Sequence, residues 1–252
     1  MNTNDFMRAI ESSKIAKHKE FIRQVIRPAI DIVKNKEAEP ILGCSRFGGV
    51  PDLPNGSQWP THNDIPHRFL GQINFADIPQ NDSGLPSSGL LGIFVALDYT
   101  EDGDEHIFWN DDGYIRAIFT PTLDDLTPIA PPSGFGIENP CEVVLEFYPT
   151  IDIPFDEYQV SIWPFEFDSE ESKTYDEMRA SLHKGNDYLL GYPSHCSLAY
   201  NPAPGMEWIS LLTVGSDDDL QWQWHDGDNL MIFVEGEKLK NSDFGMLKSD
   251  AG

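Results

Sequence analysis

The 252-residue chain carries 42 acidic and 17 basic side chains, which gives a formal charge of −25. Residues 1–40 hold eight of the bases and six of the acids, so residues 41–252 hold nine bases against 36 acids. A surface of this sign repels a phosphate backbone, so we do not expect direct nucleic-acid binding. The acidity either keeps the protein in solution or steers a basic partner towards it, and both interpretations stay open.

The cysteines and the apolar stretches indicate the compartment. Cys44, Cys141 and Cys196 are too few and too widely spaced for a disulfide framework or a tetrahedral zinc site. The start of the chain lacks the continuous apolar stretch of a secretory signal. The longest apolar stretch, residues 89–97, is far shorter than the roughly 20 residues of a membrane-spanning helix. We therefore expect a cytoplasmic protein with no membrane partner.

The chain begins with a helical pattern. From Asn4 to Ile26 apolar residues recur at mostly helical spacing between lysines and arginines. Pro28 then disfavours helix at the residue before it. We assign residues 1–28 to this N-terminal helix. A basic amphipathic helix can also lie on a membrane, but the polar stretch 11–20 favours packing against the body.

Strand patterns dominate the rest of the sequence. Glycine and proline recur every few residues from 43 to 86, which excludes long helices there. One further helix is predicted, with Asp168 or Ser169 as its N-cap and Gly185 just past its end. The expected strands cover residues 29–34, 90–97, 106–109, 114–119, 141–148, 158–163, 221–224 and 230–234.

Blocks of the first half of the sequence recur in the second half in the same order. The glycine and proline of residues 47–51 recur in 189–193, and the pairs at 69–70 and 211–212 keep the same offset. After a small change in length, residues 93–95 match 232–234. A repeat this long predicts a duplicated subdomain arranged about a pseudo-two-fold axis.

The predicted organisation follows from that repeat. After the N-terminal helix, residues 29–252 form a single duplicated domain, with a first unit at about 29–120, a connection at about 121–188 and a second unit at about 189–248. The fold class is α+β and predominantly β. Gly49 and Gly191 are expected in turns that need a positive φ or a close backbone approach.

Several of these blocks support a family resemblance. Residues 45–54 (SRFGGVPDLP), 69–74 (FLGQIN) and 85–91 (LPSSGLL), with Trp59-Pro60, resemble blocks of the YwqG-like family of bacterial proteins. In the second half, residues 190–193, 211–220 and 224–227 resemble the family's second block. The resemblance covers roughly residues 28–248, and it implies a duplicated, β-dominated α+β fold in a family of unsettled function.

This sequence departs from the family pattern in its second half. Thr213-Val214 stands where the second copy usually carries a glutamine, and Ser194-His195-Cys196 replaces an expected apolar residue and glutamine. A ligand that relied on polar residues of the second copy is therefore put in doubt.

Candidate ligand-binding residues come mainly from the first block. Gln72 and Asn74 share one face of an apolar strand and need partners if they are buried. They either hold the neighbouring proline-rich loops by structural hydrogen bonds, or line a shallow pocket with Arg46 and Trp59. The full set of candidates is Arg46, Trp59, Gln72, Asn74, Tyr192 and Asp226.

No catalytic residue, metal site or cofactor site is predicted. Adjacent residues on a strand point to opposite faces, so His195 and Cys196 do not form a working dyad with each other. The acidic loop 98–105 fails the EF-hand pattern because Trp109 stands where the bidentate glutamate belongs. The acidic run 217–219 has too few spaced ligands to name a metal.

We therefore expect a non-enzymatic binding protein that engages a macromolecular partner. The acidity favours a basic protein as that partner, and an immunity or antitoxin-like role is one biological form of this function. The first alternative is a module that binds a small molecule or peptide in a cleft near Arg46, Trp59 and Gln72. The second is an unrecognised enzyme whose candidate residues are His195, Cys196, His225 and Asp226. The sequence does not indicate the oligomeric state.

Overall fold

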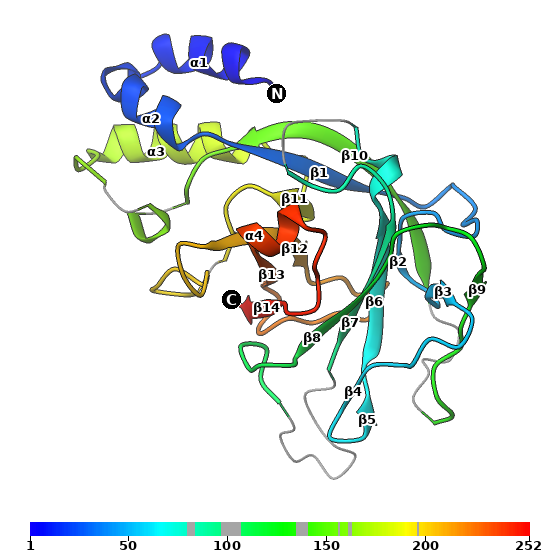
Figure 1. Cartoon of the computed structure of the whole chain (residues 1–252). Coiled ribbons are helices and arrows are strands. Elements are labelled where there is room, and N and C mark those ends of the chain that lie inside the picture. Colours follow the sequence, from blue (N-terminus) through cyan, green and yellow to red (C-terminus); the bar gives the residue numbers. More distant parts are fainter. Residues whose placement is uncertain (80–83, 97–106, 135–140, 156, 161–162, 196) are drawn as a thin grey trace.

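The computed structural model describes residues 1–252 except 80–83, 97–106, 135–140, 156, 161–162 and 196. The described residues confirm an α+β fold that is predominantly β. The helices are α1 (Thr3–Glu11), α2 (Lys19–Val25), α3 (Ser169–Ala180) and α4 (Gly236–Lys240) (Figure 1). The strands are β1 (Arg27–Asn35), β2 (Arg46–Gly48), β3 (Asp52–Pro54), β4 (Thr61–His62), β5 (Ile65–Pro66), β6 (Arg68–Asn74), β7 (Leu90–Val95), β8 (Ile115–Thr120), β9 (Leu126–Pro128), β10 (Glu142–Asp152), β11 (Tyr188–Leu190), β12 (Trp208–Gly215), β13 (Asn229–Glu235) and β14 (Lys248–Ala251).

One antiparallel sheet organises the molecule. Its strand order is β14-β13-β12-β11-β1-β10-β2-β6-β7-β8, with the β1–β10 pair at the centre. Strand β1, the first in the chain, pairs with β11, whereas β10, which lies in the expected connection, pairs with β2. We call β10, β2, β6, β7 and β8 the first half of the sheet, and β1, β11, β12, β13 and β14 the second half. The innermost strand of the first half, β10, therefore lies outside the first unit predicted from the sequence. The innermost strand of the second half, β1, likewise lies outside the predicted second unit.

Equivalent glycine turns connect the halves to the central strands. Gly49 has a φ of 70° and its N–H donates to the Cys141 carbonyl oxygen at 3.1 Å. Gly191 has a φ of 69° and its N–H donates to the Pro28 carbonyl oxygen, also at 3.1 Å. The positive φ expected at both glycines is therefore confirmed.

The halves also share a bulge in the same place. Phe69 pairs with Phe94 just before a break in the β6–β7 register, and Ser210 pairs with Phe233 just before the corresponding break between β12 and β13. Phe94 and Phe233 are thus equivalent. Along β6 and β12 the register differs by one residue from the sequence blocks, because Ser210, not Leu211, takes the place of Phe69. This symmetry is what a duplicated unit would produce, and the duplication itself stays a prediction.

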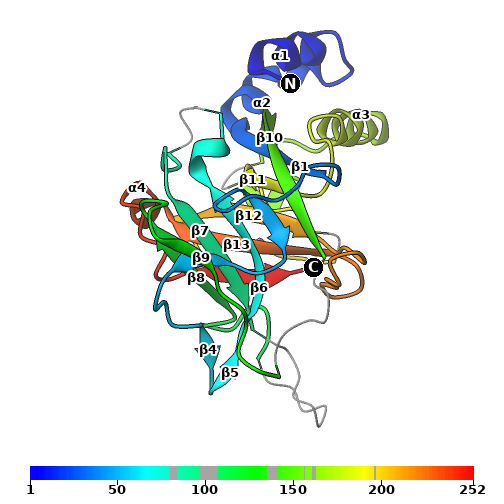
Figure 2. The same ribbon diagram turned by 90° about the vertical axis from the view of Figure 1, so that its right-hand side faces the viewer.

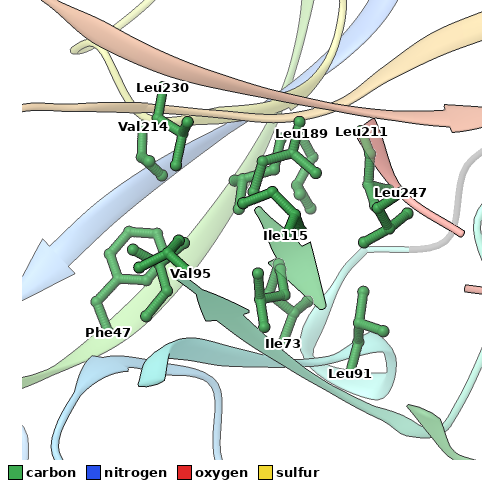
Figure 3. Close-up of a cluster of buried hydrophobic side chains, with 14 of the residues drawn as sticks. Phe47, Ile73, Leu91, Val95, Ile115, Leu189, Leu211, Val214, Leu230 and Leu247 are labelled. Carbon is green, nitrogen blue, oxygen red and sulfur yellow. The ribbon is translucent and has the colours of Figure 1, made fainter. Parts of the chain in front are cut away.

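The main hydrophobic core lies between the two halves of the sheet, which fold towards each other. Figure 3 shows Phe47, Ile73 and Leu91 of the first half facing Leu189 and Val214 of the second. At the outer ends, Ser249 of β14 donates a hydrogen bond to the Trp109 carbonyl oxygen, just before β8. Burial between the halves contributes about 25 cal/mol for each Å² of apolar surface removed from water, which is the chief stabilising contribution here.

A second core holds the helices against the central strands. Phe6 and Ile10 of α1 pack with Ile151 of β10 and with Tyr175 of α3. Helices α1, α2 and α3 gather at one end of the molecule, and the β4–β5 hairpin lies at the opposite end (Figure 1, Figure 2). No helix in the described part of the chain is long and apolar enough to cross a membrane.

The helix predicted between the halves is confirmed as α3. The Asp168 carboxylate accepts from the N–H groups of Glu170 and Glu171, both at 2.9 Å, and the Glu171 carboxylate accepts from the N–H of Asp168. This reciprocal arrangement is a capping box, which satisfies N–H groups that the first helical turn leaves unpaired. Asp168 is therefore the N-cap.

The N-terminal segment is helical, as predicted, but it forms two helices and not one. Helix α1 ends at Glu11, a 3₁₀ turn follows at Ala16–His18, and α2 begins at Lys19. The Ser13 hydroxyl donates to the Ile10 carbonyl oxygen and also accepts from a nearby backbone N–H. Such local bonds compete with the helical ladder and account for the break.

Three expected strands are wrong in the described residues. Residues 109–113 form a turn, 157–159 form a 3₁₀ turn, and the run 221–224 makes only a single bridge, from Trp222 to Asp217. Trp222 and Trp224 are buried in the main core. In the run 221–224 the two tryptophan side chains therefore fill the core although the backbone does not pair as a strand.

Candidate functional site

Arg46 and Gln72, two of the predicted ligand-binding residues, meet at a buried carboxylate. Asp52 Oδ2 accepts from Arg46 Nη1 at 2.8 Å, from Gln72 Nε2 at 2.8 Å and from the Gly43 N–H at 2.7 Å. Gln72 Oε1 in turn accepts from the Asp52 N–H at 2.9 Å. Arg46 is 4% exposed and Gln72 0%. The network fastens the segment after β2 onto the outer face of β6.

Opposite charges hold this network in its ionised form. Burial alone would lower the pKa of Arg46, but the hydrogen bond and charge of Asp52 outweigh it and raise that pKa. Burial alone would raise the pKa of Asp52, but its bonds from Arg46, Gly43 and Gln72 outweigh it and lower that pKa. A buried charge is tolerated when it is paired and hydrogen-bonded in this way.

Trp59 lies beside this network, and Asn74 is connected to it through the backbone of Gly43. The Trp59 indole donates to the His67 carbonyl oxygen at 2.8 Å, and its ring packs against Phe94 in a small outer cluster with Leu53 and Phe69. Asn74 Nδ2 donates to the Gly43 carbonyl oxygen at 2.9 Å. The first-block candidates therefore hold the covering loops, and whether any of them also binds a ligand stays a prediction.

The second half carries a different set of side chains at the equivalent place. The position of Arg46 is taken by Tyr188 and that of Gln72 by Thr213, since Arg46 pairs with Gln72 and Tyr188 pairs with Thr213. Counting from the equivalent glycines places Ser194 where Asp52 stands. The charged network of the first half thus has no charged counterpart there, in line with the departures seen in the sequence.

A cavity of about 820 Å³ opens on the outer face of the second half. Its described lining comes from α2, β12 and Arg27, from residues 158–160 and 164, and from residues 192–193 and 201–206. Tyr192 lines it, and the Tyr192 hydroxyl donates to the Val25 carbonyl oxygen at 2.7 Å while its N–H donates to Asp152 at 2.8 Å. The Arg27 guanidinium lies 4.0 Å from the centre of the Tyr192 ring. Tyr192 is therefore a predicted site residue that lines a cavity of ligand size.

A buried cluster of charges that the sequence did not reveal lies near the end of α3. His183 Nδ1 is 2.8 Å from Asp31 and its Nε2 is 3.3 Å from Asp152. Burial alone would lower the pKa of His183, but hydrogen bonds to Asp152 and Asp31 outweigh it and raise the pKa to about 9. A second cavity, of about 320 Å³, lies beside His183. Because Asp31 alternates with Ile30 and Ile32, strand periodicity places its carboxylate on the face of β1 opposite to the isoleucines, and nothing in the sequence indicates that His183 covers that face.

Asp226 lies on an acidic turn that meets another acidic turn. Its side chain is 97% exposed and stands 3.8 Å from His225. The His225 ring is 5.7 Å from the ring of Trp109, in the turn that also carries Asp111 and Asp112. The Asp112 side chain is 85% exposed, with Lys248 at 3.4 Å. Exposed carboxylates from both halves of the chain therefore gather at this corner.

The other acidic runs behave differently. Asp217 is 2.6 Å from Lys34, and Asp219 pairs with Lys36, so two of the three acids at 217–219 have a lysine partner within the chain. Asp187 also pairs with Lys34, at 2.8 Å. The loop 98–105 lies wholly within 97–106, outside the described residues. The lysines of β1 and the residues just after it thus reduce the negative field at the 217–219 run.

The enzyme candidates are not assembled into a catalytic group in the described residues. His195 is buried and its ring is 5.5 Å from that of Phe155. Cys196 lies outside the described residues. His225 stands 3.5 Å from Asp228, on the acidic turn. The described part of the chain contains no group of three or more His, Cys, Asp or Glu side chains that could hold a metal ion.

Comparisons with known proteins connect this architecture to one family. The model of a family described as a domain of unknown function (DUF1963) matches residues 45–247. The match begins at the segment that carries the Arg46 network and includes Tyr192 and both acidic turns, whereas α1, α2 and β1 precede it. A comparison with the curated proteins found no match.

Proposed function

The chain belongs to the DUF1963 family, and we propose that it is a non-enzymatic binding protein that engages a basic protein partner. The observation that carries this proposal is the corner where the turn of Asp111 and Asp112 meets the turn of Asp226. The carboxylates there are exposed, and Lys248 offsets only one of them. Clefts and rims of one sign raise the rate at which a partner of the opposite sign is captured.

The finer assignments follow from the same proposal. We propose a place for the chain among the YwqG-like proteins, supported by the sequence blocks at 45–54, 69–74 and 85–91. We further propose a cytoplasmic location and an immunity or antitoxin-like role, in which the acidic corner neutralises a basic effector. Charge complementarity supports this role, because strongly acidic surfaces suit the capture of a basic macromolecule.

The test uses charge reversal at the corner with a matched control elsewhere. A partner is captured from the cell lysate with the wild-type chain and purified, and its association and dissociation rates are measured at about 50 mM and about 150 mM salt, where the Debye length falls to about 8 Å. The double variant Asp112→Lys/Asp226→Lys should slow association more than it speeds dissociation. The control Asp176→Lys/Glu177→Lys places the same charge change on exposed positions of α3.

Two outcomes would overturn the proposal. One is binding that is indifferent to salt and to the corner variant. The other is an equal loss of association rate in the corner variant and the α3 control, which would assign the effect to total charge and leave the corner without a role.

A further inference from the structure

The cavity of about 820 Å³ beside α2 has a chemistry unlike that of the rest of the surface. Most of the described residues that line it are aromatic or apolar, and none of these described residues is acidic. The carboxylate of Glu207 lies next to Gly205 but does not line the cavity. The aromatic and sulfur-containing part of the lining consists of Phe21, Tyr158, Tyr192, Met206 and Trp208.

Arg27 is the one charged side chain among the lining residues that the structure describes. Arg27 is exposed, and no ion pair to it exists among the described residues. Its guanidinium is held over the Tyr192 ring at 4.0 Å. Because Tyr192 is fixed through bonds to Val25 and Asp152, the arginine has a rigid platform. Arg27 also forms a hydrogen bond with Tyr192. Because a guanidinium has five N–H donors, it keeps the others for an outside acceptor.

A polar group of the β12 part of the lining is also without a hydrogen-bond partner. Ser210 of β12 lines the cavity and is only 3% exposed, yet its hydroxyl has no hydrogen-bond partner within the described chain. A buried polar group without a partner is uncommon and costs free energy, so it marks a place where another molecule can complete the bonding.

We propose that this cavity binds a small organic anion with an aromatic body, whose anionic group lies against Arg27 and whose ring packs among Tyr192 and Trp208. The volume is that of a small-molecule site, and aromatic walls with few convergent polar groups are typical of such sites. The lone positive charge selects an anion and disfavours a cation. Lys248 connects this site to the acidic corner, since it lies 5.7 Å from the centre of the Trp208 ring and 3.4 Å from Asp112. The anion proposal rests on other residues and does not depend on the basic-partner proposal.

The probes are a matched pair of naphthalene dyes, 8-anilinonaphthalene-1-sulfonate and its uncharged analogue N-phenyl-1-naphthylamine, followed by fluorescence titration of the full chain. The wild type should bind one molecule of each. Arg27→Gln should weaken binding of the sulfonate by about tenfold or more, since a hydrogen bond to a charged group is worth about 1.5–3 kcal/mol, and should leave the uncharged dye within about twofold.

Two further variants keep the outcome interpretable. Arg23→Gln, an exposed arginine of α2 that does not line the cavity, makes the same charge change and should leave both dyes unaffected. Ala203→Trp places a large ring in the lining and should abolish binding of both. Near-ultraviolet circular dichroism and unfolding curves check that each variant keeps its fold, because the dyes also bind partly unfolded chains.

The proposal is wrong if the wild type binds neither dye, or if Ala203→Trp leaves the titrations unchanged. If Arg27→Gln weakens binding of both dyes equally, the cavity does not select an anion and the proposal is wrong. If Arg23→Gln and Arg27→Gln weaken sulfonate binding equally, the effect comes from the total charge of the protein and not from Arg27.

Discussion

Arg46 and Tyr188 occupy equivalent places in the two halves of the sheet, and each donates a side-chain hydrogen bond to the carbonyl oxygen four residues further along the chain. Arg46 Nη2 donates to Val50, and the Tyr188 hydroxyl donates to Tyr192 at 2.6 Å. Both bonds hold the turn that contains the positive-φ glycine. The same structural task is thus performed by a charged group in one half and a neutral group in the other.

This difference predicts unequal costs for removing the two side chains. Arg46→Met leaves the buried Asp52 carboxylate without its ion partner and should cost about 3–5 kcal/mol of unfolding free energy. Tyr188→Phe removes one hydrogen bond and should cost about 1 kcal/mol. Urea unfolding of both variants measures these losses. Arg46→Met/Asp52→Asn should recover part of the first loss, and equal costs for the two single variants would mean that the Arg46 pair is not sealed from water.

The second turn glycine is predicted to be intolerant of a side chain. Gly191 has a φ of 69°, and a Cβ there would lie 2.8 Å from Asp152 Oδ2, the group that holds the Tyr192 N–H. Gly191→Ala should therefore lower the unfolding free energy by about 1–3 kcal/mol. Gly185→Ala, at a site with no atom within 4 Å of the added Cβ, should stay within about 0.5 kcal/mol. Thermal unfolding of the two variants decides this, and similar melting temperatures would contradict it.

The capping box of α3 gives a smaller effect. Asp168→Ala removes the acceptor for two N–H groups and should cost about 1 kcal/mol. Asp176→Ala, on an exposed position of the same helix, serves as the control and should be close to neutral. Chemical unfolding monitored by circular dichroism measures both. An unchanged unfolding free energy in Asp168→Ala would mean that the first turn of α3 does not contribute to the stability of the fold.

Local features of the fold could be predicted because they depend on a few neighbouring residues. The cap at Asp168 and the turns at Gly49 and Gly191 need only the chemistry of one side chain or one φ angle. The shared face of Gln72 and Asn74 follows from strand periodicity. These predictions hold because no distant part of the chain has to be placed first.

Long-range placement could not be predicted in the same way. The pairing of β1 with β11, and of β10 with β2, joins residues more than 90 positions apart in the sequence. Hydrophobic periodicity indicates local structure and does not identify such partners. The burial of Arg46 depends on the loop that brings Asp52 over it. The cavity at Tyr192 forms only where α2 and β12 come together. The sequence therefore predicted Tyr192 as a site residue but did not predict the aromatic lining around it.

The most informative pH dependence concerns His183, which stands between Asp31 and Asp152. Its pKa in the folded protein is raised to about 9, against an ordinary value of 6.5. Because the folded state binds the proton more tightly, this group contributes its full stabilisation below pH about 6.5, and the contribution is lost as the pH rises through about 9. The unfolding free energy should therefore fall between about pH 7 and pH 9, by up to about 3 kcal/mol at about 1.4 kcal/mol per unit.

The variant His183→Gln separates this effect from other titrations. Burial lowers the pKa values of His18 and His67, so those two groups act below the chosen range. The raised pKa values of Lys34 and Arg46 place their titration above it. His183→Gln should be less stable than the wild type at pH 6.5, because it leaves two buried carboxylates without a positive partner, and its stability should change little from pH 7 to pH 9. Urea unfolding at several pH values gives both curves. Parallel curves for the two proteins would show that the proton lost in this range comes from another group, and that His183 is neutral between its two aspartates.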